Sequence, residues 1–191
     1  MQTRRDFGKL VAGGSLAVGI GTVSMGVSCN TVFNDILKYI PVALQAMTAI
    51  LSVLSGGGYT ITPAVTVALN LVKVALADLQ ADVSAYENAP ADQKNTLLGK
   101  VSTAIAIAEG NIQQFWNDLN LPQNNIAGTV SGILGVILST LAYFATQLPA
   151  PTNVAVKNVP NALPVTPKKR SVKEMKVEIN TLLKPSGQQV Y

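Results

Sequence analysis

Apolar residues recur at alternating spacings of three and four residues along four long stretches of the chain. This spacing places the apolar side chains on one face of an α-helix, and it predicts a helix that packs along its whole length. No strand-like alternation competes with it over comparable lengths. The four faces are Phe33, Leu37, Ile40, Leu44, Met47, Leu51 and Leu54; Val65, Leu69, Val72, Leu76, Leu79, Val83 and Tyr86; Leu98, Val101, Ile105, Ala108, Ile112, Phe115 and Leu119; and Val130, Leu134, Ile137, Leu141, Phe144 and Leu148.

Breaks between these stretches predict how the helices connect. The stretch "SGGGYTITP" ends the first helix, and Thr62 followed by Pro63 is typical of a helix cap and a first helical residue. The second helix is expected to end near Pro90 and the third near Pro122. Pro41 interrupts the first pattern, so it should kink that helix or mark its true start. Short connections favour antiparallel neighbours, so we predict an all-α fold, an up-down antiparallel four-helix bundle over residues 30–148.

Composition agrees with this architecture and also leaves an alternative open. Hydrophobic residues make up 48% of the 191 residues, while aromatic residues make up 5% and charged residues 13%. The charged fraction is about half that of an average soluble protein. The length indicates one modest domain, and the apolar volume indicates either closely packed helices or contact with a membrane.

The chain changes character at Pro149. Residues 149–170 are rich in proline and basic residues and show no helical period, which predicts an extended linker. Residues 171–191 begin with a capping-box pattern at Ser171 and Glu174, followed by a short amphipathic helix that either docks on the bundle or awaits a partner. Because Pro149–Pro167 isolates this tail, we expect it to be dispensable for folding.

Residues 1–29 have the order of an export signal: a basic start, a moderately apolar and glycine-rich middle, and small residues near a cut site. The start resembles the twin-arginine (Tat) export signal, which consists of Ser or Thr, two arginines, any residue, Phe, Leu and Lys. Gly8 departs from the leucine of that pattern. The matching residues are Thr3, Arg4, Arg5, Phe7 and Lys9.

Cys29, the only cysteine in the chain, ends a stretch "GVSC" that resembles a lipoprotein cleavage box. Val27 and Ser28 suit that box, whereas Gly26 stands where leucine is usual. The resemblance implies lipidation of Cys29 and a stable membrane anchor, since several acyl chains exceed the threshold for lasting attachment. The alternative is a free thiol beside a signal-peptidase site. The predicted location is the bacterial cell envelope, across the cytoplasmic membrane, periplasmic or surface-exposed.

Catalytic patterns are nearly absent. The chain contains no histidine, which removes the usual general base and the commonest metal ligand. Asp78 and Asp82 share a helix face and suit either a hard cation or, more simply, a solvated surface. The "SGGG" stretch lacks the residues that complete a phosphate-binding loop. We therefore predict no enzyme activity, no metal site and no cofactor.

Basic residues gather in the tail. Residues 30–150 carry four lysines and seven acidic residues, whereas residues 151–191 carry seven basic and two acidic residues. The tail is a candidate for contact with an anionic surface, with a solvated tail as the alternative, and nucleic acid is not a predicted partner of an exported chain. The candidate residues are Lys168, Lys169, Arg170, Lys173 and Lys176.

Three functions remain open at this point. Residues 39–72 and 119–156 carry no charge, and Gly128 and Gly132 have the spacing that lets helices approach closely in lipid. A membrane-inserted oligomer or pore is therefore one alternative, and a carrier of an apolar ligand is another. Trp116 is expected to cover the core, or to lie at a bundle edge or lipid boundary. The favoured hypothesis is a lipid-anchored envelope protein with a binding, scaffolding or assembly role and an envelope protein as its partner.

Overall fold

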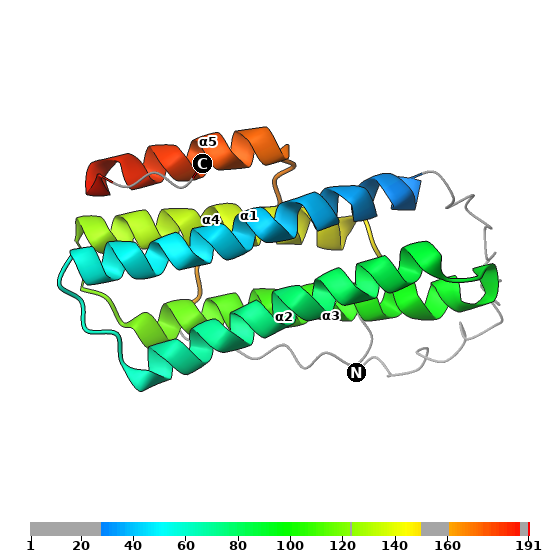
Figure 1. Ribbon diagram of the computed structural model, residues 1–191, viewed down its shortest axis with the longest axis horizontal. Helices are drawn as coiled ribbons and strands as arrows, with labels where there is room; N and C mark the ends of the chain where they lie inside the picture. The colour runs from blue at the N-terminus through cyan, green and yellow to red at the C-terminus, as the bar shows by residue number, and fades with distance from the viewer. Residues whose placement is uncertain (1–27, 123, 150–160, 188–190) are drawn as a thin grey trace, which may run out of the picture.

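The computed structural model describes residues 28–122, 124–149, 161–187 and 191, so the signal residues Arg4, Arg5, Phe7 and Lys9 lie outside the described part. Within it the chain is helical and contains no strand, which confirms the all-α prediction (Figure 1). The helices are α1 (Ser28–Gly56), α2 (Pro63–Asn88), α3 (Ala91–Leu119), α4 (Asn125–Thr146), α5 (Val172–Leu183) and the short 3₁₀ helix η1 (Lys184–Ser186).

Helix α1 begins at Ser28 and passes through Pro41 without ending. The prediction that Pro41 marks the true start of the helix is therefore wrong. The pyrrolidine ring removes one backbone hydrogen bond. Pro41 is exposed, so the carbonyl group left without that partner is on the solvent side of the helix, where water replaces the lost bond.

The turn between α1 and α2 forms as the sequence predicts. Gly58 adopts a φ of 75°, a left-handed conformation that costs glycine nothing. The Thr62 hydroxyl accepts a hydrogen bond from the Val65 N–H, and Pro63 is the first residue of α2. This cap satisfies one of the free N–H groups at the start of the helix.

Contacts run from α1 to α2, from α2 to α3, from α3 to α4 and from α4 back to α1. Helix α5 contacts α1 and α4. Figure 1 shows the result as three layers, with α5 on one side of the α1 and α4 pair and the α2 and α3 pair on the other. Helix α4 is therefore enclosed by α1, α3 and α5.

The enclosure of α4 explains its uncharged and largely apolar sequence. Ile133, Val136 and Leu138 lie off the predicted apolar face, yet their exposed fractions are 0%, 3% and 1%. The Tyr39 hydroxyl donates to the Ile137 carbonyl at 2.8 Å and ties α1 to α4. Three of the described helical stretches are long and apolar enough to cross a membrane, which is compatible with membrane association. They are Asn30–Gly56, Pro63–Asn88 and Asn125–Thr146.

Helix α5 is part of the core. Met175, Ile179 and Leu183 are buried, with exposed fractions of 1%, 0% and 0%. A Cβ atom at Gly132 would lie 2.8 Å from a Leu182 side-chain carbon, so the absence of a side chain lets α5 lie close to α4. Helix α5 therefore docks on the other helices, one of the two alternatives that the sequence left open, and its burial argues against the expectation that the tail is dispensable for folding.

The segment before α5 is also attached to the helices. The Gln113 side chain on α3 both donates to the Leu163 carbonyl, at 3.0 Å, and accepts from the Leu163 N–H, at 2.7 Å. Farther along, the Lys168 N–H donates to the Ser139 carbonyl at 2.9 Å. These bonds carry the chain across α3 and α4, although no helical period in the sequence indicates such a path.

Candidate binding site

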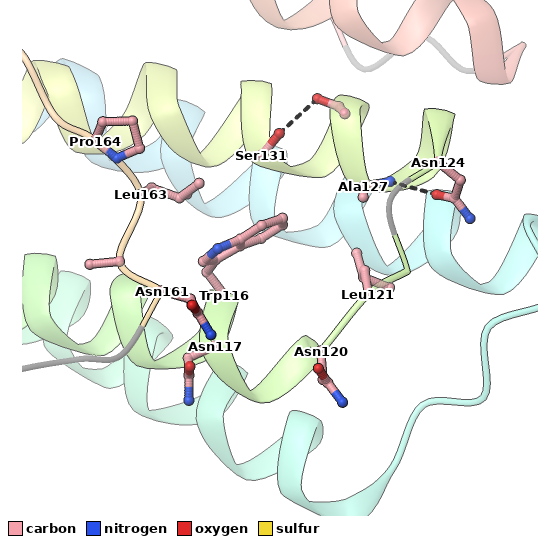
Figure 2. Close-up of a pocket in the computed structure, with 12 residues that line it drawn as sticks. Trp116, Asn117, Asn120, Leu121, Asn124, Ala127, Ser131, Asn161, Leu163 and Pro164 are labelled. Atoms are coloured by element: carbon pink, nitrogen blue, oxygen red, sulfur yellow. Dashed lines mark hydrogen bonds between the residues drawn. The ribbon is translucent and has the colours of Figure 1, made fainter.

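A cavity of about 840 Å³ lies where the end of α3, the start of α4 and the segment 161–164 meet. Figure 2 shows Trp116 in the middle of the site, with Leu163 and Pro164 on one side and Leu121 and Asn124 on the other. The volume falls in the range of small-molecule sites. The lining residues are Trp116, Asn117, Asn120, Leu121, Asn124, Ala127, Gly128, Ser131, Asn161, Ala162, Leu163 and Pro164.

Trp116 is half-buried, and its side chain packs against the hydrophobic core while also lining the cavity. Both sequence-based interpretations, a cover over the core and a position at the edge of the helices, agree with this placement. An indole in such a position offers an apolar face and an N–H donor. Among the described residues, no hydrogen-bond acceptor contacts that N–H group.

Amide side chains supply most of the polar groups of the cavity. Within residues 28–122, 124–149 and 161–187, no group contacts the side-chain amides of Asn117, Asn120 or Asn161 through a hydrogen bond. The Asn124 amide oxygen, by contrast, accepts from the Ala127 N–H at 3.0 Å and caps α4 (Figure 2). Of the four amides, that of Asn124 alone has a hydrogen-bond partner among the described residues, and a side-chain amide can both donate to and accept from water or a ligand.

Two of these asparagines have an unusual backbone. Asn120 has a φ of 42° and Asn161 a φ of 55°, and they are the two residues other than glycine with positive φ in the described part of the chain. Asparagine tolerates this conformation better than most residues. The left-handed turn fixes the direction in which each side chain leaves the backbone.

Sequence analysis singled out Trp116 but did not identify this cavity. The asparagines in "NDLNLPQNN" look like ordinary loop residues, and Asn161 comes from a segment more than 30 residues beyond them. A surplus of asparagine around a lone tryptophan was the one available signal. The arrangement offers hydrogen bonding and stacking, but it holds no acidic or basic side chain and no thiol among the described lining residues.

The predicted acidic pair lies elsewhere. Asp78 is exposed and Asp82 half-buried beside Lys100, in a second cavity of about 640 Å³ between α2 and α3. Burial raises the pKa of Asp82, an effect that Lys100 opposes and Asp78 reinforces. The described residues contain no group of three cysteine, aspartate or glutamate side chains that could hold a metal ion. The solvated-face interpretation therefore describes this pair best.

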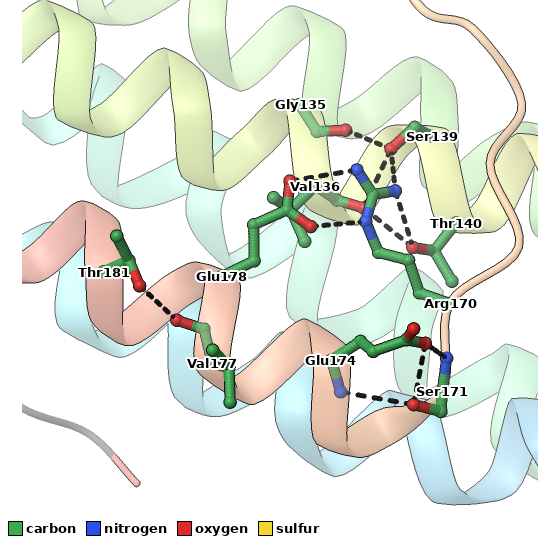
Figure 3. Close-up of polar contacts among 10 residues, drawn as sticks. All are labelled: Gly135, Val136, Ser139, Thr140, Arg170, Ser171, Glu174, Val177, Glu178 and Thr181. Atoms are coloured by element: carbon green, nitrogen blue, oxygen red, sulfur yellow. Dashed lines mark hydrogen bonds and ion pairs between the residues drawn. The ribbon is translucent and has the colours of Figure 1, made fainter.

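Arg170 does not lie with the other basic residues on the surface. Its side chain is 7% exposed, and its Nε donates to Glu178 Oε2 at 2.7 Å. One terminal nitrogen donates to the Ser139 and Thr140 hydroxyl groups on α4 (Figure 3). The same guanidinium holds the pKa of Glu178 below its usual value. Arg170 therefore joins α4 to α5, and its low exposure argues against its contact with an anionic surface, which stays a prediction.

The start of α5 lies next to this ion pair. Ser171 and Glu174 form the predicted capping box, in which the serine hydroxyl accepts from the Glu174 N–H and the Glu174 carboxylate accepts from the Ser171 N–H (Figure 3). This box satisfies two helix-terminal groups reciprocally. It fixes the first residue of α5 directly beside the anchored Arg170.

The remaining basic candidates keep their side chains outside the core. Lys168, Lys169 and Lys173 are exposed, and the Lys176 ammonium lies 5.1 Å from the centre of the Tyr191 ring. Their contact with an anionic surface stays a prediction. Cys29 lies in the first turn of α1, and its lipidation likewise stays a prediction.

Glu109 on α3 contains the one buried side-chain oxygen or nitrogen atom, among the described residues, that has no hydrogen-bond partner. Burial raises the pKa of this carboxyl from 4.5 to about 7. Desolvation disfavours the charged form, so the neutral acid is the form that the fold favours.

We predict that Glu109→Gln stabilises the protein above neutral pH. The pKa of this carboxyl is higher in the folded chain than in the unfolded chain. Its favourable contribution to the free energy of unfolding is therefore complete below about pH 4.5 and is lost as the pH rises through about 7. After allowance for its partial exposure, the gain at about pH 8 should be about 2 kcal/mol in the free energy of unfolding. Urea unfolding at several pH values measures it.

The exposed Glu87 on α2 offers a matched control. Glu87→Gln should change the free energy of unfolding little at any pH. If Glu109→Gln unfolds with the same pH dependence as the unmodified chain, the assignment of the raised pKa to Glu109 is wrong.

No protein-family model matches the chain, and neither a curated protein nor a solved structure matches it.

Proposed function

We propose that this chain is an exported, lipid-anchored protein of the bacterial cell envelope with a non-enzymatic binding, scaffolding or assembly role. The observation that carries the proposal is the sequence Thr3-Arg4-Arg5-x-Phe7-x-Lys9, followed by an apolar run that ends at Cys29. Export through the twin-arginine route delivers a folded body, and acylation of Cys29 holds that body at a membrane.

The body is an up-down antiparallel four-helix bundle with α5 docked on it. Short connections between successive helices and the cycle of contacts from α1 to α4 support this organisation. The buried apolar faces supply the cohesion, because each helix presents its apolar side to its neighbours.

Two surfaces support a binding role. The first is the cavity around Trp116. The second is an exposed apolar stripe on α2, where Val67, Leu71 and Val74 are 59%, 50% and 56% exposed. Exposed apolar stripes are typical of contacts with protein partners, which favours an envelope protein as partner.

A membrane-inserted oligomer or pore is the second candidate, because three helices are long and apolar enough to cross a membrane. The burial of Ile133, Val136 and Leu138 inside the protein argues against it. A lipid-facing helix would turn these side chains outward, whereas here they already have protein partners. The lipid-anchored body is therefore our preferred proposal.

The export proposal is tested by replacing Arg4 and Arg5 with lysine and following the precursor by cell fractionation. We expect the double variant to remain in the cytoplasm as precursor, because the twin-arginine signal needs the arginine pair rather than positive charge alone. Lys169→Arg, a charge-conserving change at an exposed position, is the control and should be exported normally.

Mass spectrometry of the exported protein completes this test. The proposal requires an acylated cysteine, Cys29, as the first mature residue. Normal export of the lysine double variant would contradict the twin-arginine route, and an unmodified Cys29 thiol would contradict the lipid anchor.

A further inference from the structure

We propose that the Trp116 cavity binds a neutral, hydroxyl-rich ligand of the oligosaccharide class. This inference deepens the proposed binding role and rests on it, and it names the ligand of the cavity between α3, α4 and the segment 161–164. Three properties of the cavity carry it: its lack of charge, its free amides and its half-buried indole.

Charge is the first property. None of the described residues that line the cavity is acidic or basic. An anionic or cationic ligand would lose hydration there without meeting a counter-charge, which is unfavourable. The site therefore selects against phosphorylated or otherwise ionised ligands.

The amides are the second property. Asn117, Asn120 and Asn161 line the cavity, and their side chains have no hydrogen-bond partner among the described residues. An apolar ligand would remove water from these groups without replacing its hydrogen bonds. A hydroxyl group both donates and accepts, as a side-chain amide does, so a ligand dense in hydroxyl groups matches this lining.

The indole is the third property. Trp116 stands in the middle of the cavity and offers an apolar ring face, while Asn117, Asn120 and Asn161 lie along one edge of the cavity (Figure 2). A pyranose ring has an apolar face of C–H groups and hydroxyl groups around its edge. Stacking on the indole therefore brings the edge hydroxyl groups towards amides at the rim. The volume of about 840 Å³ accommodates a short oligosaccharide.

The anchored segment keeps this arrangement in place without a ligand. The paired hydrogen bonds between Gln113 and Leu163 hold the segment that carries Asn161 against α3. The left-handed backbone at Asn120 and Asn161 sets the direction of both side chains. A site whose groups are already positioned loses less entropy on binding.

The test uses the purified full chain and its tryptophan fluorescence, because Trp116 is its only tryptophan and lines this cavity. The probes are maltotriose and the trisaccharide of N-acetylglucosamine, both neutral. Trigalacturonate is the anionic comparison and palmitate the apolar one. We expect at least one neutral trisaccharide to shift the emission saturably, and neither comparison ligand to do so.

Glycine replacements separate binding from folding. Asn120→Gly and Asn161→Gly remove the amide and suit the left-handed backbone, so thermal unfolding should be unchanged or improved. Each should weaken binding about tenfold, the effect of losing one well-formed hydrogen bond. Asn117→Ala serves as a third variant within a helix, and the exposed Asn70→Ala on α2 is the matched control with unchanged affinity.

The inference is overturned if neither neutral trisaccharide shifts the emission up to about 10 mM, beyond the weak end of the usual affinity scale. Wild-type affinity in the glycine variants that remain folded would overturn it too, as would saturable binding of palmitate or trigalacturonate in the cavity. These measurements in solution do not depend on the signal or the lipid. A failure here is thus distinguishable from a failure of the export proposal.

Discussion

An Ile179→Asp variant should be unable to hold α5 against α1 and α4, and it should unfold far below the melting temperature of the unmodified protein. Ile179 has an exposed fraction of 0%, and a carboxylate there would be buried without a partner. A penalty of about 4 kcal/mol or more is a large share of the stability of a typical domain. Thermal unfolding followed by circular dichroism measures this loss.

Two milder variants on α5 keep this prediction quantitative. Ile179→Ala should cost about 2 to 5 kcal/mol, since it leaves a cavity in the core. Val177→Ala on the same helix is the control, because Val177 is 59% exposed and its truncation should change stability by less than about 0.5 kcal/mol. Equal losses in the two alanine variants would show that α5 does not pack as described.

The contacts around α5 explain why a short helix after a proline-rich segment carries so much stability. Its apolar face covers α4, and Arg170 pairs with Glu178 while also donating to Ser139 and Thr140. Removing the carboxylate of Glu178 is costly, because the buried Arg170 guanidinium then loses its partner. The helix is thus held by apolar packing along its face and by an ion pair near its start.

The helices and most of the core could be predicted from the sequence. On α2 every residue of the predicted apolar face is buried, and Thr62 and Pro63 begin the helix as expected. A helical period identifies the buried side of a helix because the same face meets its neighbours along the full length. The capping box at Ser171 and Glu174 was equally readable, since it depends on residues three apart.

The position of α5 could not be predicted in this way. An amphipathic pattern shows that Met175 and Ile179 share a face, but it does not show which surface that face meets. For the same reason, the apolar residues Ile133, Val136 and Leu138, which lie off the predicted face, suited a membrane helix as well as a helix enclosed by protein. Gly132 shows the same ambiguity, because its close neighbour is Leu182 of α5.

The candidate site was less predictable still. Trp116 was noticeable as a lone tryptophan, but the cavity also needs Asn161, which approaches through the bonds between Gln113 and Leu163. Local sequence patterns do not record such long-range approaches. Likewise, the basic tail gave no sign that Arg170 turns inward while Lys168 and Lys169 remain exposed.

The central claim is that the apolar helices bury their faces against one another rather than in lipid. Its most direct test is the behaviour of residues 28–191 with Cys29→Ser, without signal or lipid, in buffer free of detergent. This chain retains α5, whose Met175, Ile179 and Leu183 are part of the core. We expect the purified chain to be monodisperse and helical without any detergent, and to unfold cooperatively.

The physical reason is that the two arrangements expose different surfaces to water. Helix α4 is enclosed by α1, α3 and α5, while α2 and α3 place Asp78, Glu87 and Lys100 in water. A membrane-inserted protein would instead present a broad apolar belt and aggregate on removal of lipid. Sedimentation velocity with and without a mild detergent distinguishes the two: our account predicts the same monodisperse species in both, and aggregation that only detergent reverses would contradict it.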